Sequence, residues 1–363
     1  MIKDHYLYLH LGDLTPDLFF KKSQKIWRKL NMKNMRIFLL LFVVFALTAC
    51  GKAAETKPAA ATGAPAETAS AAKAADPAPK KKVVIGLTVQ NLSNPFFVAM
   101  SKGAAEAAKK HGGEVIAVSA EDNLATQTAQ IEDFITKKVS MIILSSVDTK
   151  GIAAAVGQAK AAGIPIISVD TISEGGVNAS VTSDNVQAGK IAGEYLVKRL
   201  NGKGNIAVLD GPPVSAVTDR IAGFKEALKA APDIKIVANQ NGNGNRETSL
   251  AKMETILQAN GKGQIDAVFA INDPTGIGAK IAAEQAGRDK EMFIVGVDGS
   301  PDAVTTLKEN KSYVGSSAQN PFNMITIAVE TAFKVLAGEK VEPLIKLPTD
   351  FITTENVKDY KGW

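Results

Sequence analysis

From residue 82 to residue 336, short apolar runs alternate with helical patterns, and this alternation constrains the fold more than any other feature. Two such series follow one another along the chain. Strand–helix alternation with nearly continuous apolar strands is typical of parallel sheets covered by helices on both faces. The sequence therefore predicts an α/β fold with two doubly wound parallel-sheet lobes joined by a hinge.

The bounds of the expected elements follow from the apolar runs and the helical periods. The expected strands are Val83–Val89, Glu114–Ser119, Met141–Ser145, Pro165–Val169, Ala179–Thr182, Asn205–Leu209, Lys235–Ala238, Ala267–Ile271, Phe293–Val297 and Tyr313–Ser316. The expected helices are Phe96–His111, Leu124–Lys137, Thr149–Ala162, Asp184–Leu200, Val217–Ala230, Arg246–Ala259, Gly276–Ala286, Ala303–Glu309 and Pro321–Leu336.

The first part of the chain has the pattern of an export signal. Lys33 and Arg36 precede a short apolar run at 37–46, and small residues follow it. A basic start, a short apolar core and small residues before a cut are typical of a secretory signal, and the run is short for a permanent membrane anchor. We therefore expect 1–49 to be a signal region. Residues 1–31 match no part of such a signal, which suggests an upstream start assigned in error.

Cys50 is the only cysteine in the chain, and it directly follows this signal. The stretch Leu47-Thr48-Ala49-Cys50 resembles the lipobox of bacterial lipoproteins, which implies that Cys50 carries a lipid. The alternative is a plain signal peptide with an incidental cysteine. Residues 51–80 contain no aromatic or β-branched aliphatic residue, so they lack the means to build a core. We expect 50–80 to be a lipid anchor and a disordered tether.

The positive charge of the chain belongs to the expected signal region. The whole sequence has 42 basic and 37 acidic side chains. Residues 1–49 contain eight basic and three acidic ones, so the remainder carries 34 of each. A balanced charge gives no indication of nucleic-acid binding.

Most groups that catalyse reactions are missing after the expected signal. His111 is the one remaining histidine, and its place beside two lysines at a helix end favours a solvated cap. There is no free cysteine, no phosphate-binding loop and no calcium loop, and Gly242-Asn243-Gly244 is a weak match to a dinucleotide motif. We therefore expect no enzyme, no cofactor and no metal site.

Polar side chains follow the expected strands of both lobes. Asp170, Asn272 and Asp298 come directly after apolar strands, Gln319 follows another, and Arg220 lies early in an expected helix. For any one of them alone, a helix cap or a turn residue is the usual explanation. Together they are expected at one rim, where ligands of open α/β sheets bind. Amides, carboxylates and a guanidinium suit sugar hydroxyls.

The stretch Asn94-Pro95-Phe96-Phe97 follows the first strand and adds an amide and two rings to that rim. Aromatic faces suit the C–H faces of a sugar, and an amide both donates to and accepts from hydroxyls. The alternative is that Phe96 and Phe97 are buried in the core at the start of a helix.

From about residue 82 to near its end, the chain resembles the type I periplasmic binding proteins of sugar ABC importers, and among them the ribose-binding group. The stretches that carry the resemblance are 93–97, 164–170, 183–185, 189–193, 219–220, 223–224, 270–273 and 295–299. They occur in the order of the family.

The resemblance implies the roles of individual residues. Polar sugar contacts are implied for Asn94, Asp170, Arg220, Asn272, Asp298 and Gln319, and ring contacts for Phe96 and Phe97. Ribose binders have an arginine where this chain has Thr171, and an aromatic residue where it has Gly244. Both differences enlarge the pocket, which favours a sugar or polyol in general over ribose alone. The alternative is that a ring from elsewhere fills the gap and ribose still binds.

The resemblance also implies an organisation and a function. It predicts a first lobe of 81–183 plus 320–345 and a second lobe of 184–319 plus 346–363. The implied function is that of a monomeric lipoprotein on the periplasmic or cell-surface side. It captures a monosaccharide or polyol and delivers it to an ABC permease with its ATPase. A sensor that presents the ligand to a membrane receptor is the alternative. An enzyme and a transcription regulator are less consistent with the missing catalytic groups and the export signal.

Overall fold

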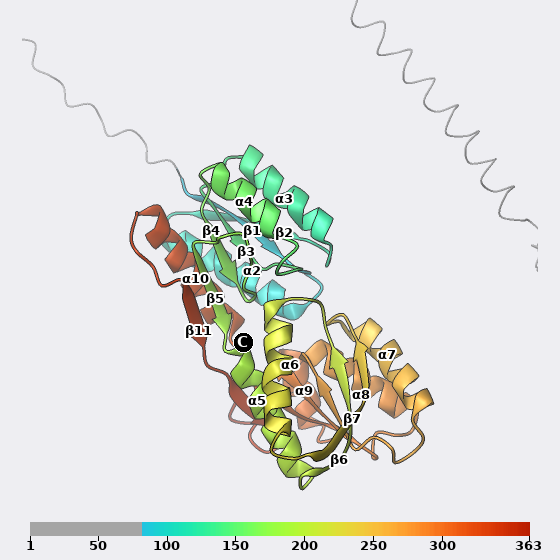
Figure 1. Cartoon of the computed structure of the whole chain (residues 1–363). Helices are drawn as coiled ribbons and strands as arrows, with labels where there is room; N and C mark the ends of the chain where they lie inside the picture. The colour runs from blue at the N-terminus through green and yellow to red at the C-terminus, as the bar shows by residue number, and fades with distance from the viewer. Residues whose placement is uncertain (1–81) are drawn as a thin grey trace, which may run out of the picture. The chain divides into compact units, whose positions relative to one another are not determined.

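The computed structural model describes residues 82–363, so the expected signal region, lipid anchor and tether lie outside the described residues. The described part contains two six-stranded sheets, one in each lobe. Figure 1 shows the two lobes, each with a sheet between layers of helices. Among residues 82–363, no helix combines the length and the apolar character needed to cross a membrane.

The sheet of the first lobe is parallel throughout, with the order β11-β5-β4-β3-β1-β2. Its strands are β1 (Val84–Val89), β2 (Glu114–Ser119), β3 (Met141–Leu144), β4 (Ile166–Val169), β5 (Ala179–Ser183) and β11 (Leu344–Leu347). One face carries α2 (Pro95–Lys110) and α10 (Pro321–Leu336), and the other carries α3 (Leu124–Thr136) and α4 (Ala153–Ala161). Both layers between sheet and helices are apolar, as expected for strands that are buried on both faces.

The sheet of the second lobe has the order β12-β10-β9-β8-β6-β7, and only β12 runs antiparallel to its neighbour. Its strands are β6 (Lys203–Asp210), β7 (Asp233–Asn241), β8 (Ala267–Ala270), β9 (Phe293–Asp298), β10 (Tyr313–Ala318) and β12 (Asp350–Thr353). One face packs against α5 (Asn185–Arg199) and α6 (Ser215–Leu228), and the other against α7 (Arg246–Ala259), α8 (Asp273–Gln285) and α9 (Pro301–Lys308).

The expected fold class is confirmed, and every expected strand and helix is present within a few residues. The expected start of α4 at Thr149 was early, because the Asp148 carboxylate accepts from the main-chain N–H groups of Lys150 and Gly151 and forms a turn there. Strands β11 and β12 were not expected. They are short, and β11 has no run of buried residues to reveal it.

The chain passes between the sheets three times: between β5 and α5, between β10 and α10, and between β11 and β12. The lobe boundary expected at 345/346 falls inside β11. In that strand Leu347 still pairs with Ser183 of β5. Each lobe is therefore assembled from segments that are far apart in the sequence.

Candidate functional site

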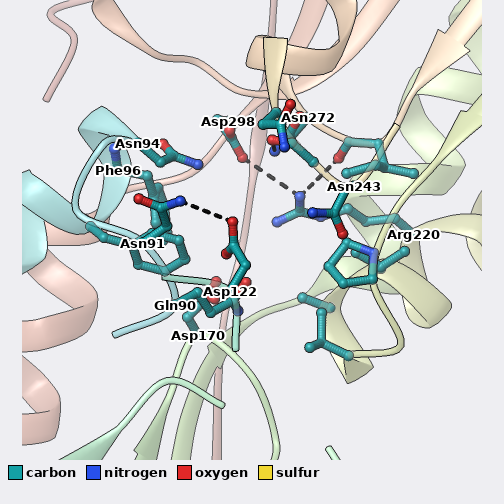
Figure 2. Close-up of a pocket in the computed structure, with 18 of the residues that line it drawn as sticks. Gln90, Asn91, Asn94, Phe96, Asp122, Asp170, Arg220, Asn243, Asn272 and Asp298 are labelled. Carbon is teal, nitrogen blue, oxygen red and sulfur yellow. Dashed lines mark hydrogen bonds and ion pairs between the residues drawn. The ribbon is translucent and has the colours of Figure 1, made fainter. Parts of the chain in front are cut away.

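A cavity lies between the lobes, at the carboxyl ends of the central strands of both sheets. It contains about 610 Å³ of empty space, counting its open mouth. Figure 2 shows its polar side chains directed inward from both lobes. The first lobe contributes Gln90, Asn91, Ser93, Asn94, Phe96, Phe97, Asp122 and Asp170, and the second contributes Pro212, Val214, Ala216, Val217, Arg220, Asn243, Gly244, Asn245, Ile271, Asn272, Asp298 and Gln319.

Arg220 is the only cationic side chain among the lining residues, and it is held rigidly. Its Nε donates to the Asn185 side chain at 2.9 Å, and one terminal nitrogen, Nη1, donates to the Ile271 carbonyl at 2.8 Å. The same nitrogen lies 3.6 Å from an Asp298 carboxylate oxygen. The other terminal nitrogen, Nη2, bonds to none of residues 82–363, and Figure 2 shows the guanidinium facing the cavity. Arg220 can therefore offer donors to a ligand without changing its own anchors.

Asn185 holds this arginine in position, although sequence reasoning did not select it. It is buried, its oxygen accepts from Arg220, and its nitrogen donates to Thr182 and to the Ser183 carbonyl. The residue lies at the first passage between the lobes. It thereby links Arg220 of the second lobe to β5 of the first.

Asp298 and Gln319 form a buried pair at the ends of β9 and β10. The Gln319 amide nitrogen donates to the Asp298 carboxylate at 2.8 Å. The Gln319 amide oxygen is buried and has no partner among the described residues. Burial raises the pKa of Asp298 well above its usual range, against the attraction of Arg220. An unpartnered buried acceptor needs a donor, and a ligand hydroxyl in the cavity would supply one.

Asp170 faces the cavity from the end of β4 in the first lobe. Its backbone has a φ of 66°, and its carbonyl accepts from the Thr182 hydroxyl at 2.6 Å. Its carboxylate accepts from Ser145 at 3.2 Å. Burial raises the pKa of Asp170 to about 6, and the charge of Arg220 acts in the opposite direction. The carboxylate is thus kept in a poorly solvated place where a hydrogen-bonding ligand would stabilise its ionised form.

The charges around the cavity favour a neutral ligand. Asp122, Asp170 and Asp298 face a single cation, Arg220. Desolvation has already raised the pKa of each of these carboxyl groups. A phosphate or carboxylate ligand would bring more negative charge to acids that lack compensation, whereas hydroxyl groups can donate to them.

Two asparagines serve both the fold and the cavity. Asn94 caps α2 by accepting from the Phe96 N–H at 3.0 Å, and Asn272 caps α8 by accepting from the Thr275 N–H at 3.0 Å. The Asn272 nitrogen also donates to the Gly244 carbonyl. The capping alternative is therefore correct for Asn272, and Asn94 is a helix cap as well; both residues also line the cavity. A cap uses only one end of an amide, and Figure 2 shows the nitrogen of Asn94 directed toward the cavity.

The two rings are buried in the core, as the alternative interpretation stated, and they line the cavity as well. Phe96 and Phe97 are 4% and 6% exposed and belong to the core of the first lobe. They also line the cavity, with their rings edge to face at 5.4 Å. One wall of the cavity is thus the edge of a packed core, which gives it a fixed shape.

Comparison with known proteins agrees with this geometry. The family model of the periplasmic binding protein domain matches residues 85–340. The chain belongs to the periplasmic binding protein family. As a member of that family it is a binding protein and not an enzyme. Among residues 82–363, there is also no cluster of side chains able to hold a metal ion.

Its relatives include named binding proteins of several bacteria. The ribose import binding protein RbsB of Bacillus subtilis (strain 168) is 34% identical over 87% of this chain and 98% of its own length. The xylitol-binding protein of Mycolicibacterium smegmatis is 33% identical over 75% of this chain and 78% of its own. An ABC transporter solute binding protein from Bacillus halodurans C-125 with bound myo-inositol has a TM-score of 0.73 and 30% identity, covering 78% of this chain and 99% of that one.

In this binding protein, eight of the nine site residues that were predicted from the sequence are found in the lining of this cavity. The exception is Thr171. Thr171 is buried, and its hydroxyl accepts from the Ser146 N–H at 2.9 Å and contacts the Ser146 hydroxyl. Gly244 lines the cavity with a φ of 68°, and the nearest atom to a Cβ built there would be the Asn272 nitrogen at 3.4 Å. The cavity is therefore open where ribose binders are expected to have an aromatic ring.

Six polar lining residues were missed: Gln90, Asn91, Ser93, Asp122, Asn243 and Asn245. Gln90 and Asn91 directly follow β1, and Asp122 follows β2 by a few residues. The Asn91 side chain donates to Asp122 at 2.9 Å (Figure 2). The rule that selected Asp170 and Asp298 would have found three of these residues if it had been applied to every strand of the sheet.

The lobes also meet directly beside the cavity, at the first residue of α6. The Ser215 hydroxyl accepts from the Ile172 N–H at 2.7 Å, and the Ser215 N–H donates to the Thr149 hydroxyl at 2.8 Å. The Thr149 N–H donates to the Pro213 carbonyl at 3.3 Å. Thr149 and Ile172 follow strands of the first lobe, so these bonds connect the two lobes.

Proposed function

We propose that this protein is the extracytoplasmic solute-binding component of an ABC importer and captures a monosaccharide or a polyol between its lobes. The observation that carries this proposal is the composition of the cavity. One anchored guanidinium, two buried carboxylates and several amides converge on it from both lobes, beside two aromatic rings. A polyhydroxylated ring with apolar C–H faces complements such a surface.

The cavity favours a narrower class of ligands than small polar molecules in general. The excess of acids around Arg220 argues against sugar acids and sugar phosphates. The absence of a side chain at Gly244 argues for a cavity that tolerates more than one ring size. The relatives described above are named for ribose and xylitol or hold myo-inositol. We therefore infer a neutral pentose, hexose or cyclic polyol, with ribose among the candidates.

Delivery to a permease follows from the two-lobed design. A ligand that touches Asp170 in one lobe and Asp298 in the other stabilises the closed form by contacts that the open form cannot make. The permease would recognise that closed shape. We further propose that Cys50 carries a lipid that holds the monomer at the membrane, on the periplasmic or cell-surface side.

A thermal-shift screen of residues 82–363 tests the binding proposal. The protein is unfolded and refolded to remove any bound solute, then heated with pentoses, hexoses, inositols and linear polyols. A ligand that binds only the folded state raises the unfolding temperature as its concentration rises. We expect this for one or a few neutral compounds and not for their acids or phosphates. No response to any neutral compound would contradict the proposal.

Transport is tested separately from binding. A strain that lacks this protein should lose uptake of the identified radiolabelled ligand at low concentration and recover it on complementation. A Cys50→Ser variant tests the anchor, since it should appear in the soluble fraction instead of the membrane fraction. Normal uptake without the protein, together with a lost transcriptional response to the ligand, would instead support the sensor alternative.

A further inference from the structure

The last described residue, Trp363, lies where the two lobes meet. Figure 1 shows the C-terminus between them, beside the crossing segments. The Trp363 ring packs against the apolar core of the first lobe, with Phe96 edge to face at 5.9 Å. Its indole Nε1–H donates to the main-chain carbonyl of Asp298 in the second lobe at 3.0 Å. A single side chain therefore contacts two cavity residues, one from each lobe.

Trp363 does not itself line the cavity, so it contacts both residues from behind. Phe96 has the Phe97 ring on one side and the Trp363 ring on another, both edge to face. The Asp298 carbonyl accepts from two donors, the Gln319 N–H at 2.9 Å and the Trp363 indole. We propose that Trp363 is a positioning residue of the ligand site, which fixes Phe96 and Asp298 relative to one another across the lobes.

The backbone of Asp298 explains why its carbonyl needs such a bond. Its φ is 129°, a region that residues with a side chain rarely adopt. A residue in such a conformation keeps it only when its surroundings fix it, and such residues are concentrated at ligand sites. The two donors on the Asp298 carbonyl fix the peptide unit that directs the carboxylate into the cavity. Without the indole, one of these two constraints is lost.

The segment before Trp363 belongs to the second lobe. Val357 is buried in the core of that lobe, and Tyr360 packs against the same core while its hydroxyl donates to the Gly299 carbonyl at 3.2 Å. The indole alone in this group packs against the core of the first lobe. Opening the lobes would therefore separate Trp363 either from Phe96 or from Asp298, so Trp363 stabilises the arrangement in which both contacts are made.

This proposal can be tested without any ligand. Residues 82–363 contain no cysteine, so in this part of the chain a spin label attaches only where a cysteine is introduced. Lys102 on α2 and Glu254 on α7 are exposed positions, one in each lobe, and Lys102→Cys with Glu254→Cys provides a pair of spin-label sites. Double electron–electron resonance then reports the distribution of distances between the lobes. We expect a narrow distribution for the wild-type background, and a broader one with longer distances for Trp363→Ala.

Two further variants distinguish the contribution of the Trp363 ring from that of its N–H group and from that of the segment before it. Trp363→Phe keeps an aromatic ring beside Phe96 but cannot donate to Asp298, so we expect an intermediate distribution. Tyr360→Phe removes only the hydrogen bond to Gly299 and should leave the wild-type distribution unchanged. If Trp363→Ala does not fold, as judged by circular dichroism, the Trp363→Phe variant decides. A wild-type distribution for the decisive variant would overturn the proposal.

Affinity provides the second measurement, and this arm rests on the proposed function. With D-ribose, xylitol and myo-inositol as probes, the dissociation constant of any that binds should increase about tenfold or more in Trp363→Ala and about threefold in Trp363→Phe. Unchanged affinity for a sugar that the wild type binds would overturn the positioning role. Failure of all three probes with the wild type bears on the proposed function alone, because the distance measurement still decides the role of Trp363.

Discussion

Gly189 on α5 faces the main-chain carbonyl of Arg220 on α6 so closely that a Cβ at residue 189 would lie 1.9 Å from the Arg220 oxygen. The contact is reciprocal, because a Cβ at Gly223 of α6 would lie 2.0 Å from the Val186 oxygen of α5. The two helices therefore touch through their backbones. This contact sets the position from which the Arg220 side chain reaches the cavity.

We predict that Gly189→Ala destabilises the second lobe by about 2–4 kcal/mol, because the helices must separate to admit a methyl group and the core beneath them loses its packing. Urea unfolding followed by circular dichroism measures this loss. Gly157→Ala is the matched control, since Gly157 is an exposed residue inside α4 with nothing within 4 Å of a Cβ. Its helix should gain up to about 1 kcal/mol. Equal effects of the two substitutions would show that the close contact between α5 and α6 is not what makes Gly189→Ala destabilising.

The raised pKa of Asp170 predicts how stability depends on pH. Between its ordinary value of 3.8 and its folded value of about 6, the folded state holds a proton that the unfolded state has lost. Stability of the unliganded protein therefore decreases as pH rises through this range, and the penalty is complete above about pH 6. Asp170→Asn has no such titration. At about pH 7.5 we expect it to be more stable than the wild type by about 1–3 kcal/mol.

The same variant should lose this advantage near pH 4, where the wild-type carboxyl group is protonated as well. Chemical unfolding of both proteins at several pH values measures the difference. Asp170→Asn should also bind sugar poorly, because the cavity loses an acceptor for hydroxyl groups. A variant that is less stable than the wild type at pH 7.5 would show that the bonds to Ser145 and the attraction of Arg220 outweigh the cost of burial.

We predict that the hydrogen bond of Ser215 at the junction of the lobes slows the dissociation of bound ligand. Ser215→Ala removes the acceptor of the Ile172 N–H, which joins the first lobe to α6 beside the cavity. We expect bound ligand to dissociate about 5- to 30-fold faster, corresponding to about 1–2 kcal/mol for a lost hydrogen bond, while the unfolding midpoint changes little. Trp363 is the only tryptophan of residues 82–363, so stopped-flow fluorescence can follow dissociation.

Ser215→Thr serves as the control for that variant, because it keeps a hydroxyl at the same position and should retain slow dissociation. If Ser215→Ala releases ligand at the wild-type rate, the contact between Ser215 and Ile172 does not contribute to the closed form.

The sequence predicted the fold well because its signals are local. The apolar strands, the helical periods and the polar residues after each strand can all be read within a few positions, and they led to Asp170, Arg220 and Asp298. Thr171 was chosen only by resemblance, and its hydroxyl instead bonds to Ser146. The part played by Trp363 depends on a contact between distant segments, which no local pattern contains.

In the second lobe, too, contacts between distant segments could not be predicted from local sequence patterns. The bond from Arg220 to Asn185 joins two helices that meet only because their glycines allow it. The glycines belong to stretches that carry the family resemblance. The close approach of α5 and α6 that they allow became clear only from the packing of the two helices. Strands β11 and β12 were missed for a related reason, since they gain their place by pairing with edges of finished sheets.

Above all, we propose that Arg220 and its acidic neighbours bind a neutral sugar or polyol between the lobes. Isothermal titration calorimetry of refolded residues 82–363 tests it most directly, using the compound with the largest thermal shift. We predict one site per chain, with affinity at least 100-fold weaker in Arg220→Lys, which keeps the charge but loses the planar fork. Lys229→Ala, at an exposed position of the second lobe, should bind as the wild type does. Binding that is unchanged in Arg220→Lys, or no binding of any neutral compound, would contradict the account.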